Sequence, residues 1–370
     1  MADIADLYKG TGISKDLLSD DGEPCILYGE LYTKYKSETI REVVSKTNID
    51  NTKLVRSKAN DVIIPCSGET AEDIATARCV LNGNILLGGD LNIIRLHGYD
   101  GAFMSYQLNG KRKYDIAKVA QGVSVVHLYG EHLKGVKTIN PCLEEQKKIA
   151  GLLALLDERI TTQNKIIDKL QSLIKGISNK LLNSKEGMPV RLGAVLKERS
   201  EKTKVNNQYT VLSSTVNGLF SQRDYFSKDI ASENNVGYKI IRLHDVVLSP
   251  QNLWMGNINY NDKFDIGIVS PSYKVFLISD DYDKRYVAAM LKTHRALYDY
   301  QLISEQGASV VRRNLNLESF GQLVFRIPPL DKQREIGKTI SLLKSRLETE
   351  SMLRATYQSQ KQYLLRQMFI

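Results

Sequence analysis

The stretch of sequence that decides the fold is residues 143–182, LEEQKKIAGLLALLDERITTQNKIIDKLQSLIKGISNKLL. Apolar residues recur in it at alternating intervals of four and three positions, the pattern of a long helix whose narrow seam packs against a partner helix. Pro141 suits the start of this helix, because its missing N–H costs little there. At 1.5 Å per residue, the helix is expected to measure about 60 Å. The ten seam positions, of which Gln163 alone is polar, are Ile149, Leu153, Leu156, Ile160, Gln163, Ile167, Leu170, Ile174, Ile177 and Leu181.

The bulk composition is that of a folded cytosolic protein. The chain has 370 residues, 42% hydrophobic and 25% charged, which is enough for two or three domains. No apolar run approaches the roughly 20 residues that span a bilayer, and the N-terminus lacks the features of a signal peptide. The net charge is +9, yet residues 1–140 carry −1, with 17 Lys and Arg against 18 Asp and Glu. Any nucleic-acid contact must therefore come from local patches rather than from a basic tail.

The start of the long helix is repeated 187 residues later. Residues 141–149 read PCLEEQKKI, and residues 328–336 read PPLDKQREI. The QGVSVV at 121–126 and the QGASVV at 306–311 form a second matching pair. The second helix has its own seam, with a polar residue, Glu350, at the position equivalent to Gln163. This polar pair is either a device that fixes register or a place where the helices separate. The second seam consists of Ile336, Ile340, Leu343, Leu347, Leu353, Tyr357 and Leu364.

The repeat predicts an α+β protein with four parts. Two mixed, strand-rich globular domains at 1–140 and 190–327 are separated by two long antiparallel helices at 141–185 and 328–370, which form a pseudo-twofold, coiled-coil-like spacer. Short β-prone runs at 26–28, 62–64 and 91–96 favour strands in the first domain. Residues 285–300 are expected to form one helix in the second domain. Two similar helices in one chain can satisfy each other's seams by antiparallel packing.

The residues that carry this repeat resemble a known family. The sequence is similar to the DNA-specificity subunits of type I restriction–modification enzymes over essentially its whole length. The first copy of the motif has Pro141, Leu143, Gln146 and Ile149, followed by Leu156-Asp157 and Ile160. The second copy has Pro328-Pro329-Leu330, Gln333, Ile336 and Leu343, but Lys344 stands where the first has Asp157.

The resemblance implies a targeting subunit without a catalytic site, metal site or cofactor of its own. Each domain is expected to recognise one half of a split double-stranded DNA target, and the helices to set the spacing between the halves. The implied partners are two methyltransferase (modification) subunits, which methylate adenine at N6 with S-adenosylmethionine, and restriction/translocase subunits, which use ATP and Mg. We expect a cytoplasmic location in a prokaryote and no membrane partner.

Candidate DNA contacts are basic and amide side chains in apparent loops, because these groups reach phosphates and base edges. The basic run at 111–113 is better explained as a solvated turn, which is the usual setting of such charge runs. The two glycine-containing repeats at 121–127 and 306–314 could instead be shared structural turns, and Trp254 could belong to a core. The candidates are Lys111, Arg112, Lys113, Gln121, Ser124, His127, Arg199, Lys202, Lys204, Gln251, Asn252, Trp254, Ser309, Arg312, Arg313 and Asn314.

Catalytic readings of the sequence are weak. Asn140-Pro141-Cys142-Leu143 faintly resembles a methyltransferase motif, but the second copy has Ile327 in place of the Asn, and no glycine-rich cofactor loop follows a strand. The alternative from another class is a helical structural or protein-interaction adaptor without DNA binding, favoured by the near-neutral first domain. Steep salt dependence of a gel shift would distinguish a DNA-binding protein from an adaptor.

Overall fold

A computed structural model describes residues 1–50, 53–122, 125–182, 187–225, 234–306 and 313–369. It divides into two compact units. The first unit contains residues 1–166 and 350–370, and the second contains residues 167–349. In the described residues, no helix is long and apolar enough to cross a membrane. The same residues contain no group of three or more His, Cys, Asp or Glu that could hold a metal ion.

The globular part of the first unit is built on a five-stranded sheet of order β1-β9-β5-β7-β3, accompanied by the smaller sheets β4-β2-β8 and β10-β6. Its strands are β1 (Ala5–Lys9), β2 (Glu23–Ile26), β3 (Thr39–Ile40), β4 (Ser45–Thr47), β5 (Asp61–Pro65), β6 (Ser67–Gly68), β7 (Arg78–Val80), β8 (Leu86–Leu87), β9 (Leu91–Leu96) and β10 (Val126–His127). Its short helices are η1 (Lys15–Leu17), α1 (Glu30–Thr33), α2 (Ala71–Ile74), α3 (Gly101–Asn109), α4 (Lys113–Val119) and α5 (Gly130–Lys134).

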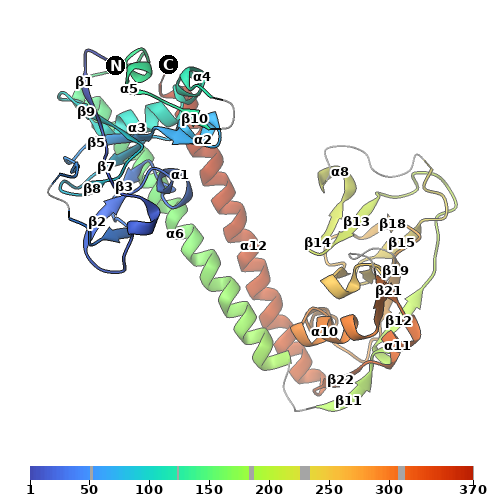
Figure 1. The fold of residues 1–370 in the computed structure, drawn as a ribbon. Helices are drawn as coiled ribbons and strands as arrows, with labels where there is room; N and C mark the ends of the chain where they lie inside the picture. The colour runs from blue at the N-terminus through green and yellow to red at the C-terminus, as the bar shows by residue number, and fades with distance from the viewer. Residues whose placement is uncertain (51–52, 123–124, 183–186, 226–233, 307–312, 370) are drawn as a thin grey trace. The chain divides into compact units, whose positions relative to one another are not determined.

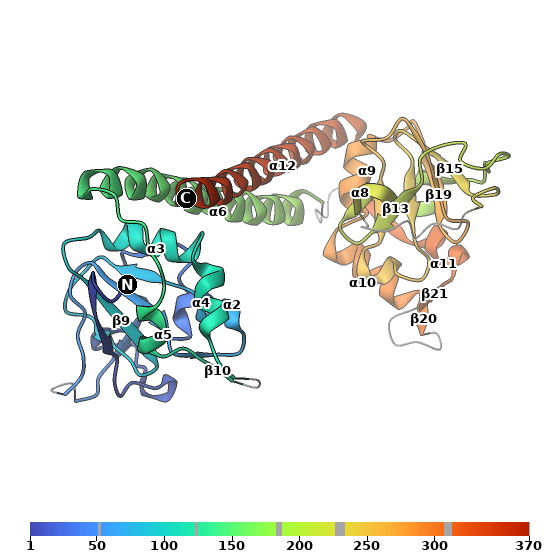
Figure 2. The same cartoon turned by 90° about the horizontal axis from the view of Figure 1, so that it is seen from above.

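Helix α3 packs between this sheet and the long helix α6 (Leu143–Leu182). Asp100 caps α3, because its carboxylate accepts a hydrogen bond from the Phe103 amide at 2.7 Å. The helix is buried on both sides: Met104 packs into the sheet core, while Phe103 packs against α6. Figure 2 shows α3 lying between α6 and the sheet.

The second unit has a four-stranded sheet of order β12-β19-β16-β17 with four two-stranded pairs, β11-β22, β13-β14, β15-β18 and β20-β21. Its strands are β11 (Met188–Arg191), β12 (Leu196–Arg199), β13 (Leu212–Thr215), β14 (Gly218–Ser221), β15 (Lys239–Arg242), β16 (Val246–Leu248), β17 (Ile258–Tyr260), β18 (Ile266–Val269), β19 (Lys274–Ile278), β20 (Ser304–Gln306), β21 (Arg313–Leu315) and β22 (Val324–Ile327). Its short helices are α7 (Leu192–Val195), α8 (Gln222–Tyr225), η2 (Leu253–Met255), α9 (Lys284–Met290), α10 (His294–Leu302) and α11 (Leu317–Gln322).

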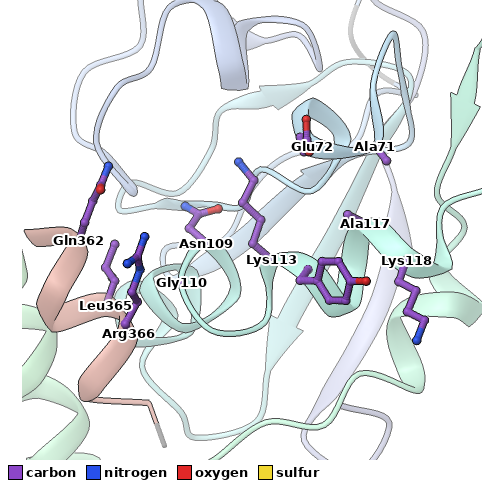
Figure 3. A pocket seen from close by; sticks show the side chains of 11 residues that line it. Ala71, Glu72, Asn109, Gly110, Lys113, Ala117, Lys118, Gln362, Leu365 and Arg366 are labelled. Atoms are coloured by element: carbon purple, nitrogen blue, oxygen red, sulfur yellow. The ribbon is translucent and has the colours of Figure 1, made fainter. Parts of the chain in front are cut away.

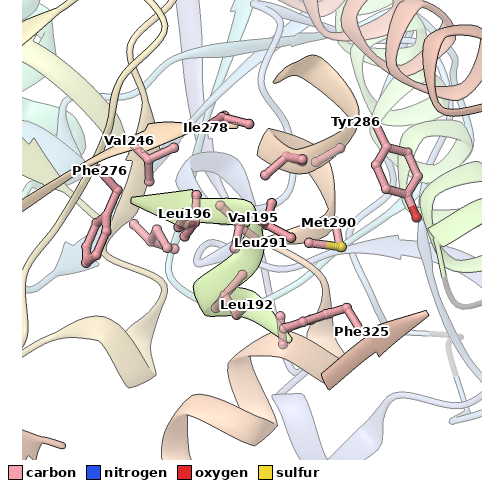
Figure 4. Packing of buried hydrophobic residues seen from close by; sticks show 14 of the residues in the cluster. Leu192, Val195, Leu196, Val246, Phe276, Ile278, Tyr286, Met290, Leu291 and Phe325 are labelled. Carbon is pink, nitrogen blue, oxygen red and sulfur yellow. The ribbon is translucent and has the colours of Figure 1, made fainter. Parts of the chain in front are cut away.

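The core of the second unit lies where α9 and α7 meet the sheet. Figure 4 shows Phe276 and Ile278 of the sheet gathered with Leu196, and Met290 of α9 beside Leu291. The single helix expected at 285–300 is wrong, because α9 and α10 are separate. The first ends at Met290, and Thr293 caps the start of the second, since its hydroxyl accepts a hydrogen bond from the Ala296 amide at 3.2 Å.

The two units repeat one sheet topology. Strands β1, β9 and β5 are neighbours in that order in the first unit, and β12, β19 and β16 are neighbours in the same order and with the same antiparallel pairing in the second. Each unit also has a buried aspartate at the first residue of β5 or immediately before β16. The carboxylate of this aspartate accepts a hydrogen bond from the backbone amide three residues earlier. These are Asp61, bonded to Lys58 at 2.7 Å, and Asp245, bonded to Arg242 at 2.8 Å.

The long helices α6 and α12 (Leu330–Gln367) pack antiparallel within each unit (Figure 1). In the first unit, Leu153 of α6 shares a core cluster with Leu365 of α12, and Gln163 bonds to Glu350. In the second unit, Ile177 and Leu182 of α6 share a cluster with Ile336 of α12. The expected fold, an α+β protein with two antiparallel long helices, is confirmed.

The polar positions of the two seams face each other. The Gln163 amide donates to the Glu350 carboxylate and also to the Glu350 carbonyl at 3.2 Å, and both residues are buried. The contact joins the two equivalent polar positions of the seams directly, with both side chains shielded from solvent. Of the two explanations that the sequence left open, a separation of the helices is therefore wrong here.

The repeated glutamine of the helix start has a structural role. In the first unit, the buried Gln146 side chain accepts a hydrogen bond from the Asp100 amide at 2.9 Å and donates to the Pro141 carbonyl at 2.7 Å. Gln333 repeats both contacts in the second unit, with Asp283 at 3.0 Å and Pro328 at 2.8 Å. Asp100 and Asp283 are the N-caps of α3 and α9. Each glutamine therefore fixes the capped helix of its globular part to the start of its long helix.

Replacing Gln146 with alanine is expected to destabilise the first unit by about 1–3 kcal/mol, because it leaves a half-buried amide and a half-buried carbonyl unpaired. Gln333→Ala should destabilise the second unit by a similar amount. Denaturant unfolding followed by circular dichroism measures both losses. The matched control is Gln171→Ala, at an exposed position of α6. An unfolding midpoint for Gln146→Ala equal to that of the control contradicts the structural role of Gln146.

Candidate nucleic-acid interface

A short turn in the first unit contains the candidates Gln121 and His127. Their backbones pair antiparallel, with the Gln121 amide 2.9 Å from the His127 carbonyl and the His127 amide 2.7 Å from the Gln121 carbonyl. Gly122 has a φ of 130°, a conformation that favours glycine. The turn is held to β6 through the pairing of β10 with Ser67–Gly68. Ser124, a further candidate, lies outside the described residues.

Aromatic and basic side chains surround this turn. The His127 ring stacks on Tyr129, with ring centroids 6.1 Å apart and an angle of 18°. Lys9 of β1 lies 5.5 Å from the centre of the Tyr129 ring, and His132 meets the same ring edge-on. Tyr129 is 45% exposed. Stacked rings beside a lysine are suited to a nucleic acid, because bases stack on aromatic faces and phosphates attract ammonium groups.

The corresponding turn in the second unit brings two separately predicted groups together. The Arg313 amide donates to the Gln251 carbonyl at 3.1 Å, so the β20–β21 hairpin touches the loop that carries the only tryptophan. The Arg313 guanidinium lies 4.9 Å from the centre of the Trp254 ring. Gln251 and Asn314 are exposed beside this pair, and Asn252 is half-buried. Ser309 and Arg312 lie outside the described residues.

Two nitrogen donors at this pair have no acceptor in the described part of the chain. They are the indole Nε1 of Trp254 and the Nε of Arg313, and both atoms are shielded from solvent. Shielded donors without acceptors cost free energy in the isolated protein.

The remaining basic candidates have different surroundings. Arg199 forms ion pairs with Asp245 at 3.3 Å and Glu201 at 3.4 Å, as Arg95 does with Asp61 at 2.8 Å in the first unit. These contacts favour a structural role for Arg199. Lys202 and Lys204 are exposed.

The basic run at 111–113 lies beside the C-terminal part of α12. Lys111 is exposed, Arg112 pairs with Asp115 at 3.4 Å, and Lys113 is half-buried in the first turn of α4. Lys113 lines a pocket of about 690 Å³ whose other wall includes Gln362 and Arg366 of α12 (Figure 3). This placement associates the run with the helix contact rather than with the 121–127 turn.

Sequence reasoning missed Lys9, Tyr129 and His132. Lys9 is on the first strand and is distant in sequence from the turn, so only the pairing of β1 with β9 and the burial of α5 bring it there. Tyr129 could have been noticed, because it is an aromatic residue two positions after His127. No such signal marked Lys9, which is one of many single lysines in the chain.

Comparisons with known proteins agree with this architecture. No family model matches the sequence. The chain is 27% identical over 179 residues to the type I restriction enzyme MjaVIII specificity subunit of Methanocaldococcus jannaschii, an alignment that covers 48% of this chain and 40% of that protein. The chain thus spans less than half the length of this curated relative.

Two solved structures share the fold along nearly the whole chain. The type I restriction–modification S subunit from M. genitalium matches with a TM-score of 0.66 and 16% identity, covering 100% of this chain and 94% of that one. A chain from a study of complex assembly and conformational transition of the type I R-M system matches with a TM-score of 0.51 and 12% identity, covering 98% and 95%.

The chain shares the fold of the M. genitalium type I restriction–modification S subunit, and one curated relative is a type I restriction enzyme specificity subunit. The resemblance carried by the repeated helix-start motif is therefore confirmed.

Proposed function

We propose that this chain is the non-catalytic DNA-targeting subunit of a type I restriction–modification complex. Residues 1–140 and 190–327 act as target-recognition domains, each binding one half of a split double-stranded DNA target. The helices at 141–185 and 328–370 set the distance between the two half-sites. Bivalent attachment of this kind combines two modest affinities and makes the unrecognised gap part of the specificity.

The observation that carries the proposal is the duplicated connection between domain and helix. Two globular parts with the same strand order each meet a long helix through the same buried glutamine, Gln146 or Gln333. Each globular part also presents a turn with aromatic and basic groups, at His127 and at Arg313. Duplication of a recognition element is what a two-part target requires.

The long helices also support the proposed partners. Leu155 of α6 is 59% exposed and its equivalent on α12, Leu342, is 61% exposed. Two equivalent apolar positions are suited to two copies of one partner, and we propose that they bind the two modification subunits. Those subunits supply S-adenosylmethionine-dependent adenine N6 methylation, and restriction subunits supply ATP- and Mg-dependent translocation and cleavage.

Expression of this chain with its neighbouring modification subunit in a host without other adenine methylation provides the test. Single-molecule sequencing of the host DNA is expected to show N6-methyladenine in a motif with two specified parts and a fixed unspecified gap. A host that carries the modification subunit alone is the control. Methylation at a contiguous motif contradicts the two-part mechanism. Methylation that does not depend on this chain favours the adaptor alternative.

A further inference from the structure

A basic pocket in the second unit has no role in the proposed recognition of bases. It has a volume of about 520 Å³, within the range of small-molecule sites. The β13–β14 hairpin, β17, α9 and α12 form its walls. We name it the Lys292 pocket, after the lysine that follows α9.

The internal repeat explains why a pocket exists here. In the first unit, the equivalent space is filled by Tyr106 and Asp157, whose hydroxyl and carboxylate are 2.7 Å apart. Asp157 corresponds to Lys344 in the 187-residue repeat. Tyr106 lies six residues after its N-cap Asp100, and Ala289 lies six after the N-cap Asp283. The second unit therefore has a methyl group in place of a phenol and an ammonium in place of a carboxylate, so that the space is open and its charge is reversed.

Lys292 is held with its ammonium group in the pocket. Its Nζ donates to the Asn259 side-chain oxygen at 2.7 Å and to the Val216 carbonyl at 3.3 Å. These two acceptors are neutral and use two of its three N–H groups. Burial lowers the pKa of Lys292 to about 8, and repulsion from Lys344 contributes. An anion in the pocket would offset both the cost of burying the Lys292 ammonium group and its repulsion from Lys344.

The other charged groups of the pocket leave a net positive charge. Glu348 is paired with Lys263 at 3.1 Å and Arg285 with Asp283 at 3.7 Å, which leaves Asp262 as the remaining carboxylate against Lys292 and Lys344. The rings of His244 and Tyr260 also line the pocket, with centroids 5.7 Å apart at an angle of 15°. Cationic groups beside stacked rings are the combination that binds a phosphate next to a nucleobase.

We propose that the Lys292 pocket binds the phosphate group of a nucleotide, with Lys292 and Lys344 as its ligands. The phosphate comes either from a free nucleotide or from the backbone of bound DNA. This site is independent of which bases the two turns recognise.

The pH dependence of binding follows from the lysine. At pH values below about 8 Lys292 is protonated, and the affinity should be constant with respect to this group. As the pH rises above about 8 the free pocket loses the proton, so affinity should fall, and binding should take up a proton from buffer. The charged and titratable groups facing the site are Lys344, Arg285 with its partner Asp283, Lys263, His244, Tyr260, Asp262 and Glu348.

The test uses the full chain and its Lys344→Met and Lys292→Met variants, with Lys338→Met as the matched control on an exposed position of α12. Calorimetric titrations at pH 7 and low salt use ATP, inorganic phosphate and a short duplex as separate probes. Lys344→Met is expected to weaken binding at least about tenfold, as expected for loss of a charge-assisted hydrogen bond. Because Lys344 is exposed, this variant decides the question if Lys292→Met fails to fold.

Each outcome has a definite meaning. Tight binding of ATP or phosphate that Lys344→Met removes supports a free nucleotide, and loss confined to the duplex supports a backbone phosphate. Absence of binding by all three probes, or an equal loss in Lys338→Met, overturns the proposal. Arg313→Ala should leave ATP and phosphate binding unchanged. The proposal that the turns recognise DNA bases and the proposal that the Lys292 pocket binds a phosphate can therefore fail independently.

Discussion

Replacing Lys361 with methionine is expected to destabilise the first unit by about 3–5 kcal/mol, the loss typical of a buried ion pair deprived of one partner. Lys361 of α12 reaches into the globular part, where its Nζ lies 2.5 Å from Asp157 and also contacts Glu38. All three side chains are at most 12% exposed. Methionine preserves the aliphatic stem but leaves two carboxylates without their cation.

The pH dependence of this loss can be derived from Glu38. Burial raises the pKa of Glu38 above its ordinary value, Lys361 opposes that increase, and Asp157 adds to it. Arg78 and Tyr106 are the other titratable groups facing these carboxylates. In the variant the pKa of Glu38 rises further, so the folded state holds its proton more tightly than the unfolded state does. The difference in stability between the two proteins should therefore grow as the pH rises from about 4 to about 7.

Urea unfolding at several pH values measures this difference. Lys165→Met, at an exposed position of α6, is the control and should change the unfolding free energy by less than about 0.5 kcal/mol. A variant whose loss of stability is the same at pH 4 and pH 7 contradicts the role of the ion pair. In that case the loss would come from packing of the Lys361 stem alone.

The second large effect is expected for Arg313→Ala, which should weaken recognition of one half-site by about 1–3 kcal/mol for each base that the guanidinium recognises. Trp254 orients this guanidinium by stacking at 4.9 Å, and the guanidinium also donates to the Gln301 carbonyl at 3.3 Å. Trp254→Ala should therefore reduce recognition of the same half-site by removing the support of the arginine. Trp254→Phe keeps a ring beneath Arg313 and should recover part of the loss.

Competition binding with duplexes altered in one half-site at a time measures the effect. The variant should lose discrimination at one half-site and retain it at the other. Arg334→Ala removes an exposed arginine of α12 and serves as the control for total charge. Equal weakening for every duplex would show that Arg313 contacts only phosphates, and an unchanged protein would exclude the hairpin from the interface.

The long helices and the repeat could be predicted because both depend on spacing within the sequence. The seam interval identified α6, and the shared glutamine identified its copy. The break between α9 and α10 could not be predicted, because residues 285–300 are mostly helix-forming. A single threonine, Thr293, caps the start of the second helix and so decides where the chain turns. Arg199 looked like a phosphate ligand until the fold placed Asp245 beside it. Local composition does not show which side chains meet across neighbouring strands. The contact between Lys9 and Tyr129 could not be predicted for the same reason.

The ion pair between Lys361 and Asp157 also determines which helices can associate. By the internal repeat, the residue of α6 equivalent to Lys361 is Ile174. If α6 of one molecule packed against α6 of another, Asp157 would face an isoleucine and lose its ion pair with Lys361. Such an association costs several kcal/mol more than the native pairing. Two helices with nearly interchangeable apolar seams therefore carry one charged contact that penalises self-association and favours pairing within the chain.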